Sequence, residues 1–231
     1  MLTVKEAEDM ISNAPKIWWF GDSWVYGAEL DNPAEQCFAN IVSNKLNLEY
    51  INLGQGATSI GHLVYTFFKH INKIKTKDIV LFFLTNKTRT FINGKNLMAN
   101  AWKNHTLNIH PHNDEWYRYF HDEEEEQWML DRDLMLLHSY CPHAKFCNIY
   151  TINHSDYIPS EAWLMPSNTC IAQIVLPYVH KGFNLNDHPA LLDTEWKEQK
   201  LYVEKYFASG GHPNKLGHEK IAEKILGCLN A

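Results

Sequence analysis

The stretch Lys16–Trp24, KIWWFGDSW, decides the fold, because an apolar run ends there in a short polar turn. Residues 16–20 predict a short buried strand, and Gly21 with Asp22 predicts the turn that follows it. Ser23 therefore stands directly after a strand. The rest of the chain indicates what kind of sheet this strand belongs to.

Apolar runs that alternate with helical periodicity continue beyond this stretch. We expect strands over residues 49–53, 78–84 and 144–152 and a short edge strand over 171–176. We expect helices over residues 4–12, capped by Thr3, and over 33–46, 60–74, 114–140, 191–207 and 216–229. Strands separated by helices of crossover length predict an α/β fold, a three-layer, flavodoxin-like parallel sheet with helices on both faces.

Length and composition predict one domain. The chain has 231 residues, of which 45% are hydrophobic and 21% charged, an ordinary mixture for a folded protein. Residues 88–113 lack a clear period and are interpreted as an insertion, so we expect a single domain over 1–231 that carries it. The oligomeric state is not indicated by the sequence.

The charge and the cysteines exclude several classes of protein. A formal net charge of −6 without a basic stripe argues against a nucleic-acid partner. The five cysteines are scattered and show no C-x-x-C spacing, which favours reduced core thiols over a disulfide framework. The first ten residues carry acids where a signal peptide needs basic residues, and no apolar run has the length of a membrane span. A cytoplasmic location is therefore expected.

Polar residues that suit hydrolysis follow the predicted strands. In an open parallel sheet, ligands bind outside the carboxyl ends of the strands. A serine hydroxyl needs a base to become a nucleophile, and the oxyanion that it forms needs donors placed in advance. Ser23 and His212 are the candidate nucleophile and base. The backbone N–H groups of Ser23 and Gly56 and the side-chain amide of Asn86 are candidate oxyanion donors.

The order of these motifs resembles the SGNH (GDSL-like) hydrolase family, whose blocks carry Ser, Gly, Asn and His in that sequence. Residues 20–27, FGDSWVYG, resemble the first block, and residues 212–218, HPNKLGH, resemble the last. In residues 52–59, NLGQGATS, the alignment selects Gly56 rather than Gly54 as the oxyanion donor. The third block keeps only its Asn, as Asn86. The resemblance spans nearly the whole chain and implies an SGNH hydrolase fold and an esterase, thioesterase or lipase activity.

The chain departs from the family where the orienting acid normally stands, three residues before the histidine. This position is Ser209. A Ser–His dyad, with a backbone carbonyl or Ser209 holding Nδ1 of His212, is the favoured explanation. A carboxylate from elsewhere, with Asp187, Asp193 and Asp156 as candidates, and a low or absent activity are the alternatives.

Other candidate residues are weaker. Arg89, Trp24 and Trp102 are possible substrate-binding residues, although a surface ion pair is the more common fate of an arginine. The aromatic residues near the insertion and Trp163 would either bind substrate or form a small satellite core. His218 is expected to cap or pack, and Asp22 to anchor the turn. The histidines around His110 and His112 lack metal-ligand spacing, so no metal and no cofactor are expected.

The sequence thus predicts a serine esterase that cleaves a carboxylic ester, with acetyl on a carbohydrate as the first choice, and a small-molecule or carbohydrate ester as its partner. The alternative is a catalytically weak module that binds a carbohydrate or another partner. A metal-dependent phosphodiesterase, which EDTA would inactivate, is a third and minor hypothesis.

Overall fold

The central element of the fold is a parallel sheet. A computed structural model describes residues 14–92, 95–97, 122–149, 153–176 and 201–230. Four strands, β1 (Lys16–Phe20), β2 (Glu49–Asn52), β3 (Ile79–Leu84) and β6 (Lys145–Asn148), lie in the order β2-β1-β3-β6. Every pair is parallel. This order is that of flavodoxin-like sheets, so the predicted α/β class and topology are confirmed.

The two faces of the sheet are apolar for a simple reason. Side chains alternate between the faces of a strand, and β1 and β3 are hydrophobic at almost every position. Trp19 and Phe83 stack on one face, with ring centroids 5.5 Å apart. Phe20 and Phe82 meet on the other, with centroids 5.1 Å apart. Both faces therefore need cover, and two separate hydrophobic cores result.

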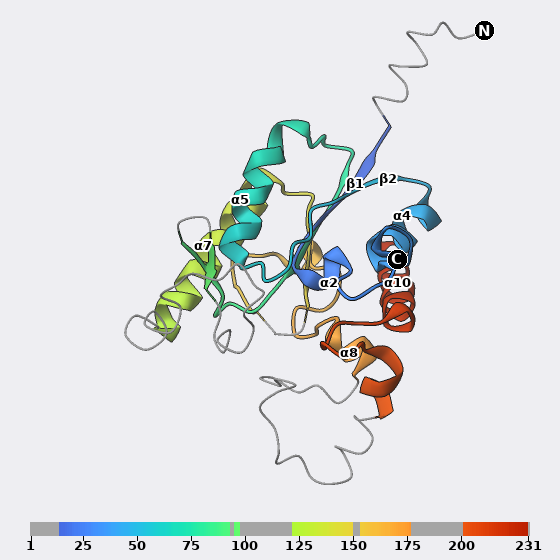
Figure 1. Ribbon diagram of the computed structural model, residues 1–231. Coiled ribbons are helices and arrows are strands. Elements are labelled where there is room, and N and C mark those ends of the chain that lie inside the picture. Colours follow the sequence, from blue (N-terminus) through green and yellow to red (C-terminus); the bar gives the residue numbers. More distant parts are fainter. Residues whose placement is uncertain (1–13, 93–94, 98–121, 150–152, 177–200, 231) are drawn as a thin grey trace, which may run out of the picture.

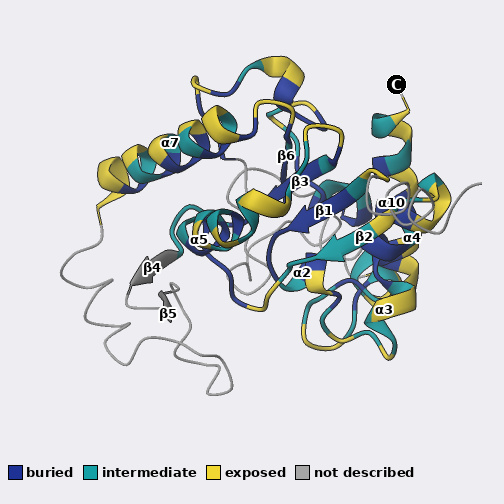
Figure 2. Cartoon of the chain, turned by 90° about the horizontal axis from the view of Figure 1, so that it is seen from above, coloured by how far each residue is buried: buried dark blue, intermediate teal, exposed yellow. Residues whose placement is uncertain are grey.

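Helices provide that cover on both sides. One face packs against α4 (Phe38–Leu46), α8 (Ala172–Val175) and α10 (Lys215–Leu229), and the other against α5 (Ile60–His70) and α7 (Glu123–Tyr140). Figures 1 and 2 show α5 and α7 on one side of the strands and α4 and α10 on the other. The remaining short helices are α2 (Ser23–Tyr26), α3 (Pro33–Gln36), η1 (Ile71–Lys73) and η3 (Ser160–Ala162).

Several predicted boundaries were wrong. The expected edge strand over 171–176 is the helix α8, because Leu176 N and neighbouring amides bond within the segment. The expected helix over 33–46 divides at Cys37, whose backbone is extended. Of the expected helix over 114–140, residues 114–121 lie outside the described residues, and the helix α7 begins at Glu123, where the extended Asp122 is its N-cap and accepts the Glu125 N–H.

Part of the predicted insertion lies within the described residues. It contains an antiparallel pair, β4 (Thr90–Ile92) and β5 (Lys95–Leu97). Trp102, His110 and His112 lie outside the described residues, as do the expected helix over 4–12 and the candidate acids Asp187 and Asp193. Of the expected helix over 191–207, residues 201–207 are described, and 201–206 are helical. The expected helix over 216–229 is α10, which follows the loop of His212.

The cysteines are reduced thiols, as the sequence predicts. All five cysteines are free thiols, and four of them are buried: Cys37, Cys141, Cys147 and Cys170. Burial raises the pKa of the Cys37 thiol to about 12 and that of Cys141 to about 11, so these thiols are core residues. Within the described ranges, no helix combines the length and the apolar character that a bilayer crossing requires.

Candidate active site

Ser23 lies at the carboxyl edge of the sheet and is the first residue of α2. The Asp22 carboxylate caps this short helix by accepting the Trp24 N–H at 2.9 Å, and Gly27 ends it with a left-handed φ of 83°. The turn after β1 therefore holds the serine side chain in one place. The expectation that Asp22 anchors this turn is confirmed.

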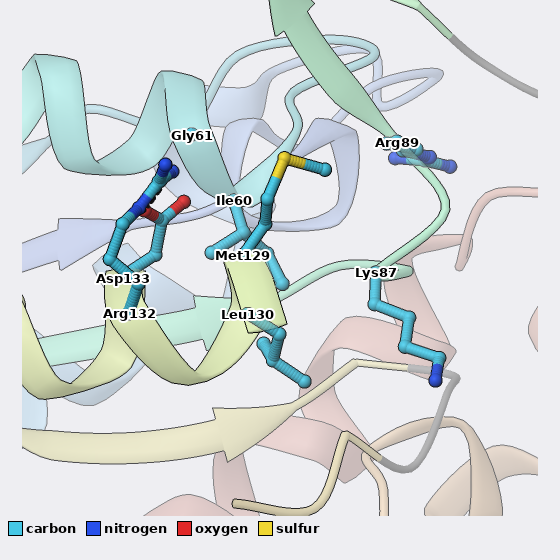
Figure 3. A pocket seen from close by; sticks show the side chains of 8 residues that line it. All are labelled: Ile60, Gly61, Lys87, Arg89, Met129, Leu130, Arg132 and Asp133. Atoms are coloured by element: carbon cyan, nitrogen blue, oxygen red, sulfur yellow. Dashed lines mark hydrogen bonds and ion pairs between the residues drawn. The ribbon is translucent and has the colours of Figure 1, made fainter. Parts of the chain in front are cut away.

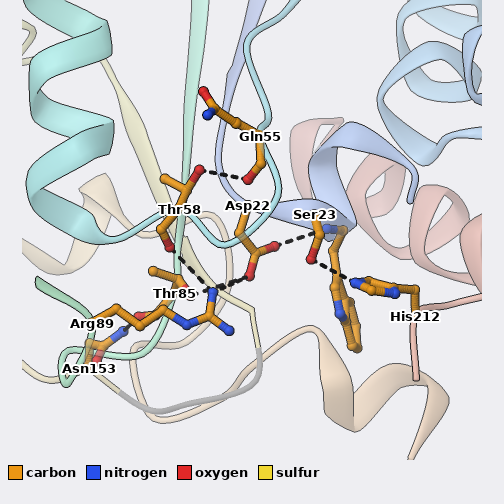
Figure 4. Close-up of polar contacts among 9 residues, drawn as sticks. Asp22, Ser23, Gln55, Thr58, Thr85, Arg89, Asn153 and His212 are labelled. Atoms are coloured by element: carbon orange, nitrogen blue, oxygen red, sulfur yellow. Dashed lines mark hydrogen bonds and ion pairs between the residues drawn. The ribbon is translucent and has the colours of Figure 1, made fainter. Parts of the chain in front are cut away.

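His212 reaches Ser23 from the loop before α10. Oγ of Ser23 and Nε2 of His212 are hydrogen-bonded at 2.9 Å, although 189 positions separate the two residues (Figure 4). The loop is closed by the Ala208 N–H bonded to the His212 carbonyl at 2.8 Å and by a bridge between Phe207 and Pro213. The predicted nucleophile and base are thus within hydrogen-bond reach of one another.

A carboxylate stands on the other side of the imidazole. Oε2 of Glu29 lies 2.6 Å from Nδ1 of His212, and the same oxygen accepts the His212 backbone N–H at 3.1 Å. This geometry differs from the expected dyad, in which a backbone carbonyl or Ser209 would hold Nδ1. Asp156, the one described acid among the earlier candidates, is 94% exposed and lies beside His154 instead.

Glu29 was missed in the sequence because nothing in its local pattern marks it. It stands six residues after Ser23, in a segment without periodicity, and the family pattern directs attention to position 209. Its one distinguishing property, a positive φ of 66°, is visible only in the backbone. Glutamate is not among the residues that commonly adopt this conformation, so no sequence rule would have placed it there.

The hydrogen bonds around His212 define its tautomer. An ionised carboxylate can only accept, so Nδ1 of His212 carries the hydrogen that is donated to Glu29, and in this tautomer Nε2 is the acceptor of the Ser23 hydroxyl. Partial burial raises the pKa of Glu29, but hydrogen bonds from the His212 side chain and from the backbone N–H groups of His212 and Gly210 outweigh that effect. The pKa of Glu29 therefore lies below its usual value, and the carboxylate is ionised at neutral pH.

Two of the predicted oxyanion donors have N–H groups that no described residue uses. Among the described residues, neither the Ser23 N–H nor the Gly56 N–H donates a hydrogen bond, and Gly56 is exposed. The Gly54 N–H, in contrast, is bonded to the Asn52 side chain at 2.9 Å. A Cβ on Gly54 would also stand 2.5 Å from the Tyr26 nitrogen. Gly54 therefore lets the loop approach α2 closely, which leaves Gly56 as the better candidate donor.

Asn86 follows β3 and has one end of its amide occupied. Its Oδ1 accepts the Thr88 N–H at 3.1 Å, so the amide nitrogen points away from that turn and remains a possible donor. Its role at the oxyanion remains a prediction.

Arg89 belongs to a buried ion pair. Its guanidinium donates to the Asp22 carboxylate at 3.1 Å and to the Thr58 carbonyl at 3.3 Å, and the Asp22 side chain is completely buried (Figure 4). Thr85 also donates to Asp22, at 3.3 Å. Arg89 thus forms an ion pair, as most arginines do, but its partner is Asp22, the acid next to Ser23, and not a surface residue.

The remaining candidates are core residues. Trp24 is 5% exposed and packs edge-on against Phe207, with ring centroids 5.7 Å apart, so it joins α2 to the His212 loop and offers little surface to a substrate. Trp163 packs against Phe146 of β6 and belongs to the main core on that face of the sheet, so it forms neither a satellite core nor a substrate surface. His218 is fully buried, stacks on Phe38 and accepts its N–H at 3.2 Å, which confirms the expected packing role.

A small open pocket of about 60 Å³ lies between α5, α7 and the loop after β3 (Figure 3). Ile60, Met129 and Leu130 form its apolar part, and Lys87, Arg89 and Arg132 contribute cations. Arg89 is the residue that it shares with the network around Asp22. In the described part of the chain, no group of three or more His, Cys, Asp or Glu side chains is arranged to hold a metal ion.

Comparisons with known proteins give fold-level likenesses at low identity. Neither the protein-family models nor the curated proteins include a match to this sequence. A two-domain esterase active on acetylated mannans, co-crystallised with mannopentaose, has 14% identity and a TM-score of 0.49. The alignment covers 98% of this chain but 52% of that one, so the chain spans about half the length of that esterase.

Two shorter proteins match along most of their length. A member of the lipolytic protein G-D-S-L family from Veillonella parvula has 13% identity and a TM-score of 0.43, with 93% of this chain and 97% of that chain covered. The psychrotrophic esterase EstA from a Pseudoalteromonas species, inhibited by monoethylphosphonate, has 14% identity and a TM-score of 0.47, with 93% and 96% covered. The chain is thus similar in its path to solved esterases and lipolytic proteins of the G-D-S-L type.

Proposed function

We propose that this chain hydrolyses carboxylic esters, with Ser23 as the nucleophile and His212 as the general base. The hydrogen bond of 2.9 Å from the Ser23 hydroxyl to Nε2 of His212 is the observation that carries the proposal. Both residues lie at the carboxyl edge of a parallel sheet, where ligands of such folds bind.

Acylation follows from the direction of that hydrogen bond. The Ser23 oxygen attacks the ester carbonyl while Nε2 of His212 takes the hydroxyl proton. The carbonyl oxygen becomes an oxyanion, for which the N–H groups of Ser23 and Gly56 and the Asn86 amide are the proposed donors. Collapse of the tetrahedral intermediate breaks the bond to the alcohol oxygen, which receives the proton from His212. An acyl-serine ester remains.

Deacylation repeats these steps with water. His212 removes a proton from a water molecule that attacks the acyl-serine carbonyl, and the same donors hold the second oxyanion. The Ser23 oxygen then leaves and recovers its proton from His212. The products are a carboxylic acid and an alcohol, and no cofactor takes part in these steps.

The proposed substrate class is an ester of a small acyl group, with acetyl on a carbohydrate as the first compound to test. The second candidate function is a catalytically weak binding module. Its main support was the missing acid at Ser209, whereas Oε2 of Glu29 lies 2.6 Å from Nδ1 of His212. The geometry therefore favours the hydrolase.

A comparison of Ser23→Ala with the wild type tests the proposal. We expect the wild type to hydrolyse p-nitrophenyl acetate and to react covalently with a fluorophosphonate probe, and Ser23→Ala to do neither. Ser160→Ala is the matched control, because this exposed serine lies in η3 and its hydroxyl bonds to Glu161. Equal rates for the wild type and Ser23→Ala would remove Ser23 from the mechanism and favour the binding module.

A further inference from the structure

We propose that Glu29 is the positioning residue for His212 and takes the place of the acid that the family pattern puts at position 209. The acid then comes from the loop that follows the nucleophile and not from the loop that carries the base. The kinetic part of this inference rests on the proposed ester hydrolysis, whereas its structural part does not.

The first argument is that Glu29 binds the whole histidine loop and not the ring alone. Oε2 contacts Nδ1 of His212 at 2.6 Å and the His212 backbone N–H at 3.1 Å, and Oε1 accepts the Gly210 N–H at 2.8 Å. One carboxylate therefore holds both the ring and the backbone that carries it. A surface ion pair formed by chance would need only one of these contacts.

The second argument is chemical. A carboxylate at Nδ1 selects the tautomer whose Nε2 accepts the serine proton, and it stabilises the imidazolium that forms during the reaction. The pKa of Glu29 is lowered by the hydrogen bonds named above, so the negative charge is present at neutral pH. The side chains of Glu29 and His212 are each 28% exposed, so solvent only partly screens the pair.

The third argument concerns the backbone of the loop. Glu29 has a left-handed φ of 66°, which is strained for a residue with a long side chain. The turn that imposes it is bonded directly to the nucleophile, because the N–H groups of Gly27 and Ala28 both donate to the Ser23 carbonyl, at 3.0 and 2.9 Å. The nucleophile and the acid are therefore parts of one turn. Strain of this kind persists where the surrounding contacts determine the conformation.

The alternatives within the described chain do not reach the imidazole. Ser209 is exposed, and Asp156 pairs with His154 at 3.7 Å. Asp31, two residues beyond Glu29, is exposed and makes no contact with His212. Asp31→Asn is therefore a matched control, because it removes an acid of the same loop without touching the site.

Glu29→Gln provides the kinetic test. We expect it to lower kcat for p-nitrophenyl acetate and the rate of fluorophosphonate labelling by about 100- to 10,000-fold, as loss of the orienting acid does in serine proteases, with KM changed by less than about threefold. Asp31→Asn should retain the wild-type rates. Wild-type kcat and labelling in Glu29→Gln, in a protein whose Ser23→Ala variant is inactive, would overturn the inference and leave the proposed function standing.

A second measurement separates the two proposals if the wild type proves inactive toward both reagents. An Nδ1–H bonded to a carboxylate gives a strongly downfield proton signal in NMR, which the His212→Gln variant assigns by its absence. We expect this signal in the wild type and in Asp31→Asn, and its loss or large upfield shift in Glu29→Gln. The same signal in Glu29→Gln as in the wild type would show that Glu29 does not hold Nδ1.

Discussion

Gly210 lies so close to Glu29 that a Cβ on this glycine would stand 2.4 Å from Oε1 and 2.6 Å from Cδ of the glutamate. Its N–H donates to the same Oε1 at 2.8 Å. A side chain at position 210 would therefore force the carboxylate of Glu29 to shift. A substitution at position 210 can therefore displace the carboxylate while Glu29 itself stays unchanged.

Gly210→Ala should displace Glu29 from His212. We expect kcat for p-nitrophenyl acetate to fall toward the value of Glu29→Gln, and the double variant Gly210→Ala/Glu29→Gln to be little worse than Glu29→Gln alone, because both changes remove the same interaction. The control is Gly227→Ala on α10, where a Cβ meets nothing within 4 Å. If the double variant instead shows the product of the two single-variant losses in kcat, the two substitutions act independently, and Gly210→Ala does not act through Glu29.

Moving the acid back to position 209 should recover part of the activity. In the Glu29→Gln background, Ser209→Asp gives His212 the acid at the position of the family pattern. We expect kcat of the double variant to exceed that of Glu29→Gln by at least about tenfold, a part of what the orienting acid contributes in a triad. Ser209→Asn in the same background is the control, because an amide cannot supply the charge. Equal rates for the Asp and Asn versions would count against this recovery.

The Asn86 amide can be tested separately from its turn. Because Oδ1 accepts the Thr88 N–H, Asn86→Asp keeps the acceptor of the turn and removes the donor that an oxyanion needs. We expect kcat to fall by about 100-fold or more in Asn86→Asp, the usual cost of losing an oxyanion donor, and to fall similarly in Asn86→Ala. Near-normal kcat in Asn86→Asp, measured by steady-state kinetics, would assign Asn86 to the turn alone.

The ion pair of Arg89 and Asp22 should matter more for stability than for substrate binding. Arg89→Met removes the cation beside a carboxylate that is fully buried. The expected loss in the free energy of unfolding is about 3 kcal/mol, the usual cost of breaking a buried pair by removing one partner. Urea denaturation of Arg89→Met and of the exposed control Lys77→Met measures it. A loss below about 1 kcal/mol for Arg89→Met would show that the pair contributes no more than an exposed one.

His218 gives the protein a pH-dependent stability. Burial, together with the smaller effect of the nearby His212, lowers its pKa to about 3, whereas an unfolded histidine titrates near pH 6.5. The unfolded state therefore binds more protons between these values. The contribution of this group to stability is present above about pH 6.5 and is lost progressively as the pH falls toward 3.

His218→Gln should weaken that dependence, since the amide oxygen can still accept the Phe38 N–H without titrating. The slope of unfolding free energy against pH should fall by up to about 1.4 kcal/mol per pH unit between pH 4 and 6. Urea denaturation at several pH values measures the slope. An unchanged slope in His218→Gln would mean that other groups cause it.

The sheet could be predicted from sequence because local signals and global packing agree there. The strands KIWWF and IVLFFL are too hydrophobic for anything but a doubly covered position, and the turn residues after them mark the site. The edge strand expected over 171–176 failed for the opposite reason. A short apolar run has no period of its own, and its burial among α10 and the sheet decides that it forms α8.

Only those site residues that lie within sequence motifs could be predicted. Ser23 and His212 are marked by their neighbours in sequence, and the structure brings them together. Glu29 has no such neighbours, because its position depends on a turn that closes in three dimensions and on the absence of a side chain at Gly210. A carboxylate that meets the histidine only in the folded protein stands at no fixed spacing in the sequence, so no motif marks it.

The distance in sequence between the nucleophile and its base has a consequence for how the protein is made. Ser23 and Glu29 leave the ribosome before His212, which is added 189 residues after the serine. At ordinary rates of about 5–20 residues per second, a nascent chain spends roughly ten seconds or more with a serine that has no base. Any hydrolytic competence therefore arises only after the loop of His212 and α10 have docked, and the appearance of covalent labelling during synthesis would time the closure of the fold.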